Sequence, residues 1–356
     1  MYFFPRVEQS LHVKSSSYLK NIYFKKKIPK PTIEDVNISK ELVHFYSKLK
    51  NNKNVTSSEW TWINKKKRYH FINFLKKKDY SSISKILVNL FHDQLSYGII
   101  SSNANQLLNK KNKIKFASSI IKDYSTWLEF VKEKNNDLKY LHTKGNIGNF
   151  YGLNISNSII MPDTPRHDYF AKKLIDIFQN SIKKKSLLVE IGGGYGGLLL
   201  QLLKRNFNQI YLNVDILETL LLNYYLLKKF LKRKIIFCDI HKPKKFSKNN
   251  IYICTKNYLK TINTNIGVVF NCNSFSEMSL NDINYYFKII HKKQTNYILH
   301  QNSNVLLYPK SKMHIENLAS NFPINKKIYK LIYQCVSPWS SGSGRYREYL
   351  YKRIID

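Results

Sequence analysis

A short apolar run that leads directly into a cluster of glycines constrains the fold of this chain more than any other stretch. Residues 186–191 (Ser-Leu-Leu-Val-Glu-Ile) are typical of a buried parallel strand, and a leucine-rich run follows the glycines at 198–203. Gly192, Gly194 and Gly197 match the G-x-G-x-x-G spacing of a nucleotide-binding turn. The pattern therefore predicts a strand, a tight turn and a helix whose N-terminus can approach a ligand closely.

Acidic residues stand at the ends of three predicted strands in this part of the chain. Glu190 precedes the first glycine by two residues, Asp215 ends the strand 209–214, and Asp239 ends the strand 234–238. An acid at the position of Asp215 can hydrogen-bond the hydroxyls of a ribose in a βαβ unit. An ionisable group such as Glu190 is costly to bury unless it meets a polar or cationic ligand. We therefore expect a doubly wound α/β sheet with a nucleotide-like ligand at one edge, the alternative being polar strand ends without a ligand.

The charge of Glu190 separates two kinds of ligand that bind such a turn. A dinucleotide carries an anionic pyrophosphate, which a carboxylate at this position would repel. S-adenosylmethionine instead carries an amino group and a sulfonium, and neither is repelled. Glu190 therefore favours the methyl donor, and a nicotinamide dehydrogenase is the less favoured interpretation.

Two motifs carry a resemblance to a known class of enzymes. The run 189–197 (Val-Glu-Ile-Gly-Gly-Gly-Tyr-Gly-Gly) resembles the first motif of class I S-adenosylmethionine-dependent methyltransferases. Together with the run 271–278 (Asn-Cys-Asn-Ser-Phe-Ser-Glu-Met), it resembles the sugar O-methyltransferases found with bacterial surface-polysaccharide genes. The class resemblance covers about residues 165–300. It implies a Rossmann-like sheet, mostly parallel with an antiparallel C-terminal hairpin, and S-adenosyl-L-methionine as the cofactor.

The resemblance and the strand ends together define the expected donor site. We expect the donor to lie across the glycine turn, with its ribose hydroxyls at Asp215 and its adenine close to Asp239. The expected cofactor-binding residues are Glu190, Gly192, Gly194, Gly197, Asp215, Asp239 and Asn271.

Methyl transfer from a sulfonium is an in-line displacement that needs alignment, and a sugar hydroxyl also needs a base to accept its proton. Glu277 and His300 follow predicted strands, and His167 lies in the first turn of a helix that begins at Thr164. Glu277 is the first choice because it belongs to the motif shared with the sugar family. Capping of the next helix by Glu277 and loop hydrogen bonding by His300 are the alternatives. No compact carboxylate pair of the kind that a divalent cation prefers is evident, so a metal site is disfavoured but stays open.

The chain divides at about residue 150. Residues 1–150 repeat apolar side chains at helical spacing, which predicts a mainly helical N-terminal region that forms a substrate wall or lid. Residues 151–356 form the predicted Rossmann-like methyltransferase domain, with a turn at 340–344 and a last strand at 346–354. We expect the acceptor hydroxyl between the 271–278 loop, His300 and the approach 151–168.

The net charge of +36 does not by itself identify a partner. Of the 59 basic residues only eight are arginine, whereas nucleic-acid sites rely on arginine for bidentate contacts. Such a lysine excess is typical of an A+T-rich coding genome, and its runs fit solvated helix faces. Nucleic acid is therefore a less favoured partner, although attraction to RNA, an acidic polysaccharide or an anionic membrane face stays open.

These observations predict an enzyme that methylates a sugar hydroxyl of a surface polysaccharide, on a glycan or a nucleotide- or lipid-linked precursor. An RNA methyltransferase and a non-catalytic donor-binding subunit are the alternatives; the Asn-Pro-Pro-Tyr motif of amino-group methylation is replaced by Asn-Cys-Asn-Ser at 271–274. The four scattered cysteines fit buried thiols in a reducing cytoplasm. No window of eighteen apolar residues exists, so no transmembrane segment is expected.

Overall fold

The computed structural model of this chain describes most of its residues, and these form two compact units. The described residues are 17–50, 57–101, 107, 109–131, 138–182, 186–240, 245–306, 317–340 and 344–354. The first unit takes the described residues within 1–44, 67–173 and 197–207, and the second takes those within 45–66, 174–196 and 208–356. The centre of the turn predicted at 340–344 lies outside the described residues.

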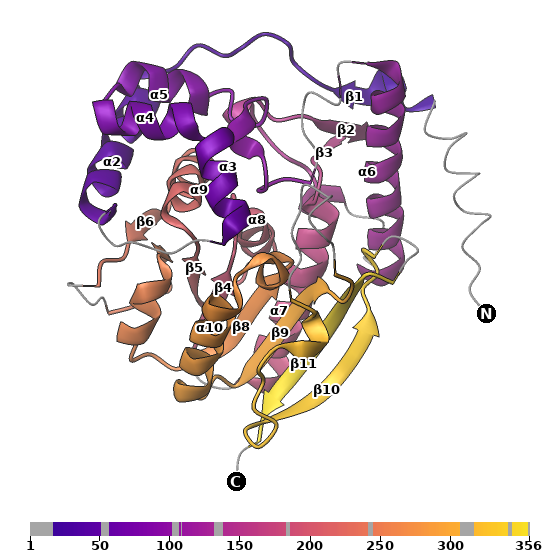
Figure 1. The fold of residues 1–356 in the computed structure, drawn as a ribbon. Coiled ribbons are helices and arrows are strands. Elements are labelled where there is room, and N and C mark those ends of the chain that lie inside the picture. Colours follow the sequence, from indigo (N-terminus) through magenta and orange to yellow (C-terminus); the bar gives the residue numbers. More distant parts are fainter. Residues whose placement is uncertain are drawn as a thin grey trace. The chain divides into compact units, whose positions relative to one another are not determined.

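The second unit is built on an eight-stranded sheet with the order β10-β11-β9-β8-β4-β5-β7-β6 (Figure 1). The strands are β4 (Leu187–Ile191), β5 (Ile210–Val214), β6 (Lys234–Phe237), β7 (Asn250–Cys254), β8 (Ile266–Cys272), β9 (Tyr297–Ser303), β10 (Tyr329–Val336) and β11 (Tyr346–Arg353). The strands from β6 across to β9 pair in parallel, whereas β11 pairs antiparallel with both β9 and β10. This arrangement confirms the predicted sheet and its C-terminal hairpin.

The glycine motif directly follows β4, a strand in the interior of this sheet. All five residues of β4 are buried, and the strand pairs with β5 on one side and β8 on the other. Alternation along β4 places Leu187, Val189 and Ile191 in the apolar core that α10 (Leu280–Lys292) also enters. The opposite face of β4 carries Glu190, so the same alternation brings this carboxyl to the other side of the sheet.

The strand order separates two acids that follow one another in the sequence. The strand β7 pairs with β5, and β6 pairs only with β7, at the edge of the sheet. Asp239, which follows β6, therefore lies at the end of a strand two places from the one that leads to Asp215. The sequence could not show this, because β6 and β7 are both short apolar runs and either could neighbour β5.

Two predicted strand ends lie farther along than the sequence indicated. His300 is the fourth residue of the seven-residue β9 and is fully buried, although it was expected to follow the strand. Strand β9 continues because β11 pairs with it as far as Tyr346 opposite Ser303. Asn271 likewise lies inside β8, opposite His300.

The first unit contains a small three-stranded sheet and most of the N-terminal helices. Its strands are β1 (Ile22–Tyr23), β2 (Gly152–Ile155) and β3 (Ser158–Ile160), and its helices include α4 (Tyr69–Lys77), α5 (Tyr80–Leu87), α6 (Lys110–Val131) and α8 (Gly197–Lys204). Two helices, α2 (Ile33–Leu49) and α7 (Thr164–Ser181), continue from this unit into the second, which also holds α3 (Ser58–Lys66) and α9 (Leu217–Phe230). The N-terminal region is thus mainly helical, as predicted. The proposed division at residue 150 stays a prediction.

Among the helices of the described residues, none has the length and apolar character needed to cross a membrane.

Candidate functional site

The glycine turn after β4 adopts backbone angles that side chains other than glycine rarely allow. Gly192 and Gly194 have φ values of 76° and 54°, in the left-handed region. A Cβ atom on Gly192 would lie 2.0 Å from the Ser274 hydroxyl oxygen, so the turn also requires glycine because another loop approaches it. Gly197 is the first residue of α8. The sequence therefore identified the turn correctly, but not its contact with the loop after β8.

Asp215 lies against this turn. One carboxylate oxygen, Oδ2, accepts a hydrogen bond from the Gly194 amide at 3.0 Å, and Oδ1 accepts one from the Ile216 amide at 2.7 Å. Its own amide donates to the carbonyl of Cys254, at the end of β7. The half-buried carboxylate is thus fixed between the glycine turn and the ends of two strands, and its contact with a ligand stays a prediction.

Glu190 is a carboxyl group buried in the sheet directly before the turn. Its side chain is 5% exposed, and its Oε2 accepts a hydrogen bond from the Tyr211 hydroxyl of β5. Burial raises the pKa of Glu190 to about 7, and the nearby charge of Asp215 adds to this rise, whereas the Tyr211 hydrogen bond opposes it. Near neutral pH this group can therefore change its charge when a ligand binds.

Two buried asparagines next to the turn were not among the expected site residues. Asn213 of β5 packs against Gly193, and neither its amide oxygen nor its amide nitrogen has a hydrogen-bond partner. Asn223 of α9 donates to the Gly194 carbonyl at 3.2 Å, but its side-chain oxygen has no partner. Both side chains are fully buried. A polar residue inside the apolar run of β5, two positions before Asp215, was the sequence signal for the first of them.

Asn271 ties the loop after β8 to the end of β4. Its amide nitrogen donates to the Ile191 carbonyl at 2.8 Å and to the Ser274 hydroxyl at 2.5 Å. Its amide oxygen accepts from the Phe275 amide and from the side chain of Asn302 in β9. Because protein groups occupy both ends of its amide, Asn271 positions the 271–278 loop beside the glycine turn.

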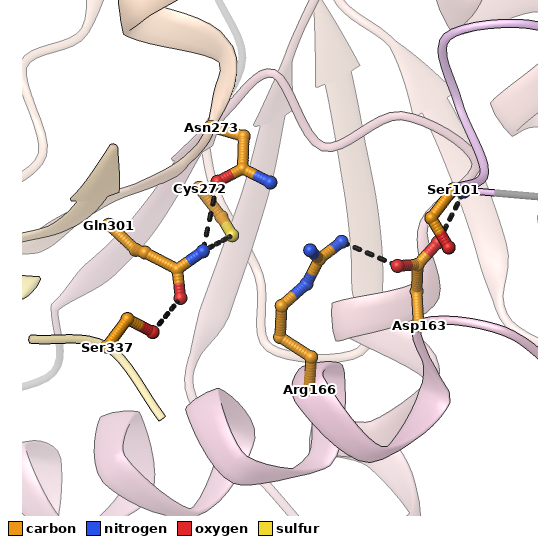
Figure 2. Close-up of polar contacts among 7 residues, drawn as sticks. All are labelled: Ser101, Asp163, Arg166, Cys272, Asn273, Gln301 and Ser337. Carbon is orange, nitrogen blue, oxygen red and sulfur yellow. Dashed lines mark hydrogen bonds and ion pairs between the residues drawn. The ribbon is translucent and has the colours of Figure 1, made fainter. Parts of the chain in front are cut away.

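A second amide, Asn273, is held at the start of this loop (Figure 2). Its φ of 68° is unusual for a residue other than glycine and indicates local strain. The buried side chain of Gln301 donates to the Asn273 side-chain oxygen at 2.9 Å, and Ser337 in turn donates to Gln301 at 2.6 Å (Figure 2). The backbone N–H of Asn273 also donates to the backbone carbonyl of Gln301 at 2.7 Å. This chain of contacts fixes the direction of the half-exposed Asn273 side chain.

The two candidate bases of the second unit lie in different environments. Glu277 ends a short 3-10 helix, Ser274–Glu277, and is half-buried. His300 is fully buried and stacks on Tyr349, with ring centres 4.9 Å apart. Burial lowers the pKa of His300 to about 3, so this imidazole is neutral at physiological pH and a weak proton acceptor.

The third candidate, His167, belongs to a charged cluster of the first unit. Asp163, at φ 65°, accepts hydrogen bonds at 2.8 Å from both the Arg166 guanidinium and the Ser101 amide (Figure 2). Burial lowers the pKa of His167 to about 4; Asp163 opposes this shift and Arg166 adds to it. Asp123 of α6, which the sequence did not single out, has its pKa raised to about 7 by burial and by the charge of Asp163.

Asp239 already has a cationic partner inside the second unit. Its Oδ2 lies 2.8 Å from the Lys48 ammonium at the end of α2. The strand next to β5 is β7, and the residue that follows it is the buried Thr255. The assignment of Asp239 to the adenine stays a prediction, with Thr255 as a neighbour that the sequence did not identify.

No family model matches this chain, and no curated protein matches it either. Several solved structures do resemble it. The small RNA methyltransferase HEN1 is 15% identical over 54% of this chain and 25% of its own, with a TM-score of 0.38. The chain therefore spans about a quarter of that protein's length.

Two further structures match larger parts of their own chains. The magnesium protoporphyrin IX methyltransferase from Synechocystis PCC 6803, with bound S-adenosylhomocysteine, is 8% identical over 66% of this chain and 99% of its own, with a TM-score of 0.37. A glycopeptide N-methyltransferase in complex with S-adenosyl-L-methionine is 9% identical over 52% of this chain and 93% of its own, with a TM-score of 0.35. Each of the three structures is that of a methyltransferase.

Proposed function

We propose that this protein is an S-adenosylmethionine-dependent O-methyltransferase that acts on a sugar hydroxyl of a surface polysaccharide or its precursor. The observation that carries the proposal is the contact of the Asp215 carboxylate with the glycine turn, directly beside the buried Glu190. Acids at these two positions suit a ligand that combines a ribose with a positive charge. A dinucleotide would bring its pyrophosphate towards both carboxylates.

The residues around the turn fit the methyl donor. Gly192 and Gly194 allow the left-handed backbone of the turn, and Gly197 begins α8. Asp215 would hold the ribose hydroxyls, and Glu190 would favour the cationic part. The unpartnered amide of Asn213 offers further hydrogen-bonding capacity beneath the turn. Asn271 would contribute by holding the 271–278 loop in place. When bound, the donor supplies the electrophilic methyl group.

Proton removal from the acceptor hydroxyl is the task of the protein. We assign this role first to Glu277, since its half-buried carboxylate lies on the loop that Asn271 and Ser274 join to the glycine turn. His300 ranks below it because this imidazole is fully buried inside β9 and stacked on Tyr349, and His167 because it lies in the charged cluster of Asp163 and Arg166 in the first unit. His300 then supports the sheet by stacking on Tyr349.

The proposed substrate can be tested by measuring the methylation of the organism's own surface glycans. Mass spectrometry of surface glycans from a strain without this gene is expected to show a sugar that lacks one methyl group, restored by the wild-type gene. A strain that carries the Asp215→Ala variant should match the deletion. Unchanged glycans together with an undermethylated RNA would instead support the RNA methyltransferase, which the net charge of +36 keeps as the second candidate.

A further inference from the structure

Glu190 is a buried acid of this lysine-rich chain that has no basic partner among the described residues. Within the described residues it forms no ion pair, and its one hydrogen bond comes from the neutral Tyr211 hydroxyl. Other buried acids do have such partners, in the pairs Asp163–Arg166, Asp168–Arg205, Asp239–Lys48 and Asp282–Lys256. Although the chain has 59 lysines and arginines, none of those in the described residues forms an ion pair with this carboxyl.

The described groups that the structure places around Glu190 are neutral or negative. The neighbouring strand β5 presents Tyr211, the unpartnered Asn213 and the carboxylate of Asp215. On the other side, the residue of β8 opposite Glu190 is the apolar Phe270. Helix α9 contributes the neutral Asn223 to the adjacent turn. A buried carboxylate in such surroundings carries a desolvation cost that a positive charge on a ligand would offset.

We propose that Glu190 makes this site selective for the charge on the sulfur, so that the cationic donor binds more tightly than its neutral demethylated product and releases a proton as it binds. The inference rests on the proposed binding of the donor across the glycine turn. Donor and product share the adenosine, the amino group and the carboxylate, and they differ in the methyl group and in one positive charge. The discrimination would help the product to leave after each turnover.

Because protonation of Glu190 and donor binding are linked, the direction in which donor affinity changes with pH can be predicted. With the pKa of Glu190 at about 7, lowering the pH from 8 to 6 protonates this carboxyl in the free protein. The donor's extra charge favours the ionised form, so it lowers the pKa of Glu190 and loses affinity as the pH falls. The product brings no sulfonium, so its affinity should change much less over the same range.

Calorimetric titration with S-adenosylmethionine and with S-adenosylhomocysteine at both pH values tests this directly. For the wild-type protein we expect donor affinity about tenfold weaker at pH 6 than at pH 8, and product affinity changed less than about threefold. Buffers of different ionisation enthalpy should report proton release with the donor. In the Glu190→Gln variant, donor affinity should no longer depend more strongly on pH than product affinity does. The amino groups of the two ligands also titrate in this range, and because they do so equally with both proteins, subtracting the variant's pH dependence corrects for them.

Tyr211→Phe provides a second variant if Glu190→Gln fails to fold. The Tyr211 hydrogen bond lowers the pKa of Glu190, so its removal should move the midpoint of the donor's pH dependence to higher pH. Equal pH dependence for donor and product, or a pH dependence unchanged in both variants, would refute the role of Glu190. Binding of neither ligand to the wild-type protein would refute the donor site itself, and this inference with it.

Discussion

At the scale of single residues, burial decides which of the expected groups can do chemistry. Asp215 and the glycines lie where their sequence positions indicated. Strand ends, and turns that require a positive φ, are marked in the sequence by apolar runs and by glycines. The lowered pKa of His300 had no such signal, since it follows from burial inside the folded sheet, where Tyr349, almost fifty residues away in the chain, stacks on the imidazole. Nor could the sequence show that Lys48 of α2 pairs with Asp239.

Removal of the Asp215 side chain tests the donor site at this scale. Asp215→Ala should lose charge-assisted hydrogen bonds to the ribose, each worth roughly 1.5–3 kcal/mol, which calorimetry with S-adenosylhomocysteine would report as weaker binding. Asp239→Ala is the matched control, and we expect a smaller loss because Lys48 already neutralises that carboxylate. Unchanged affinity in Asp215→Ala would remove Asp215 from the donor site.

At the scale of elements, the central strand and the two loops beside it form one assembly. The turn after β4 and the loop after β8 meet where Gly192 approaches Ser274, and Asn271 hydrogen-bonds the end of β4. The strand–turn–helix sequence of the motif was predictable because apolar runs and glycines are local signals. The insertion of β7 between β5 and β6 was not, since strand order depends on packing between distant segments.

Substitution of Gly192 tests this assembly. Gly192→Ala places a methyl group 2.0 Å from the Ser274 oxygen at a φ of 76°, so we expect a loss of roughly 1–3 kcal/mol in the free energy of unfolding and weaker donor binding. Gly145→Ala is the control, since its φ is 82° but its added methyl group would have no neighbour closer than 3.9 Å. Denaturant unfolding and calorimetry measure both. A Gly192→Ala protein with wild-type stability and affinity would contradict the close approach of the two loops.

At the scale of the whole molecule, the fold class could be predicted from the sequence, whereas the donor site and the acceptor stay predictions. One motif defines the turn, whereas the loop after β8 is held by contacts such as the hydrogen bond from Gln301 to Asn273, which form only in the folded chain. The net charge of +36 is a property of the entire sequence and does not distinguish a glycan from RNA. The central claim, methyl transfer to a sugar hydroxyl, therefore needs a direct test of the product.

That test is transfer of labelled methyl groups from S-adenosylmethionine to the glycan fraction of a strain without the gene, with total RNA as the competing acceptor. We expect the wild-type protein to label the glycan. Glu277→Gln should retain donor binding but lose roughly 10²–10⁴-fold in turnover, because the acceptor hydroxyl keeps its proton. Label in RNA alone, or a protein that binds the donor and labels neither fraction, would contradict the account.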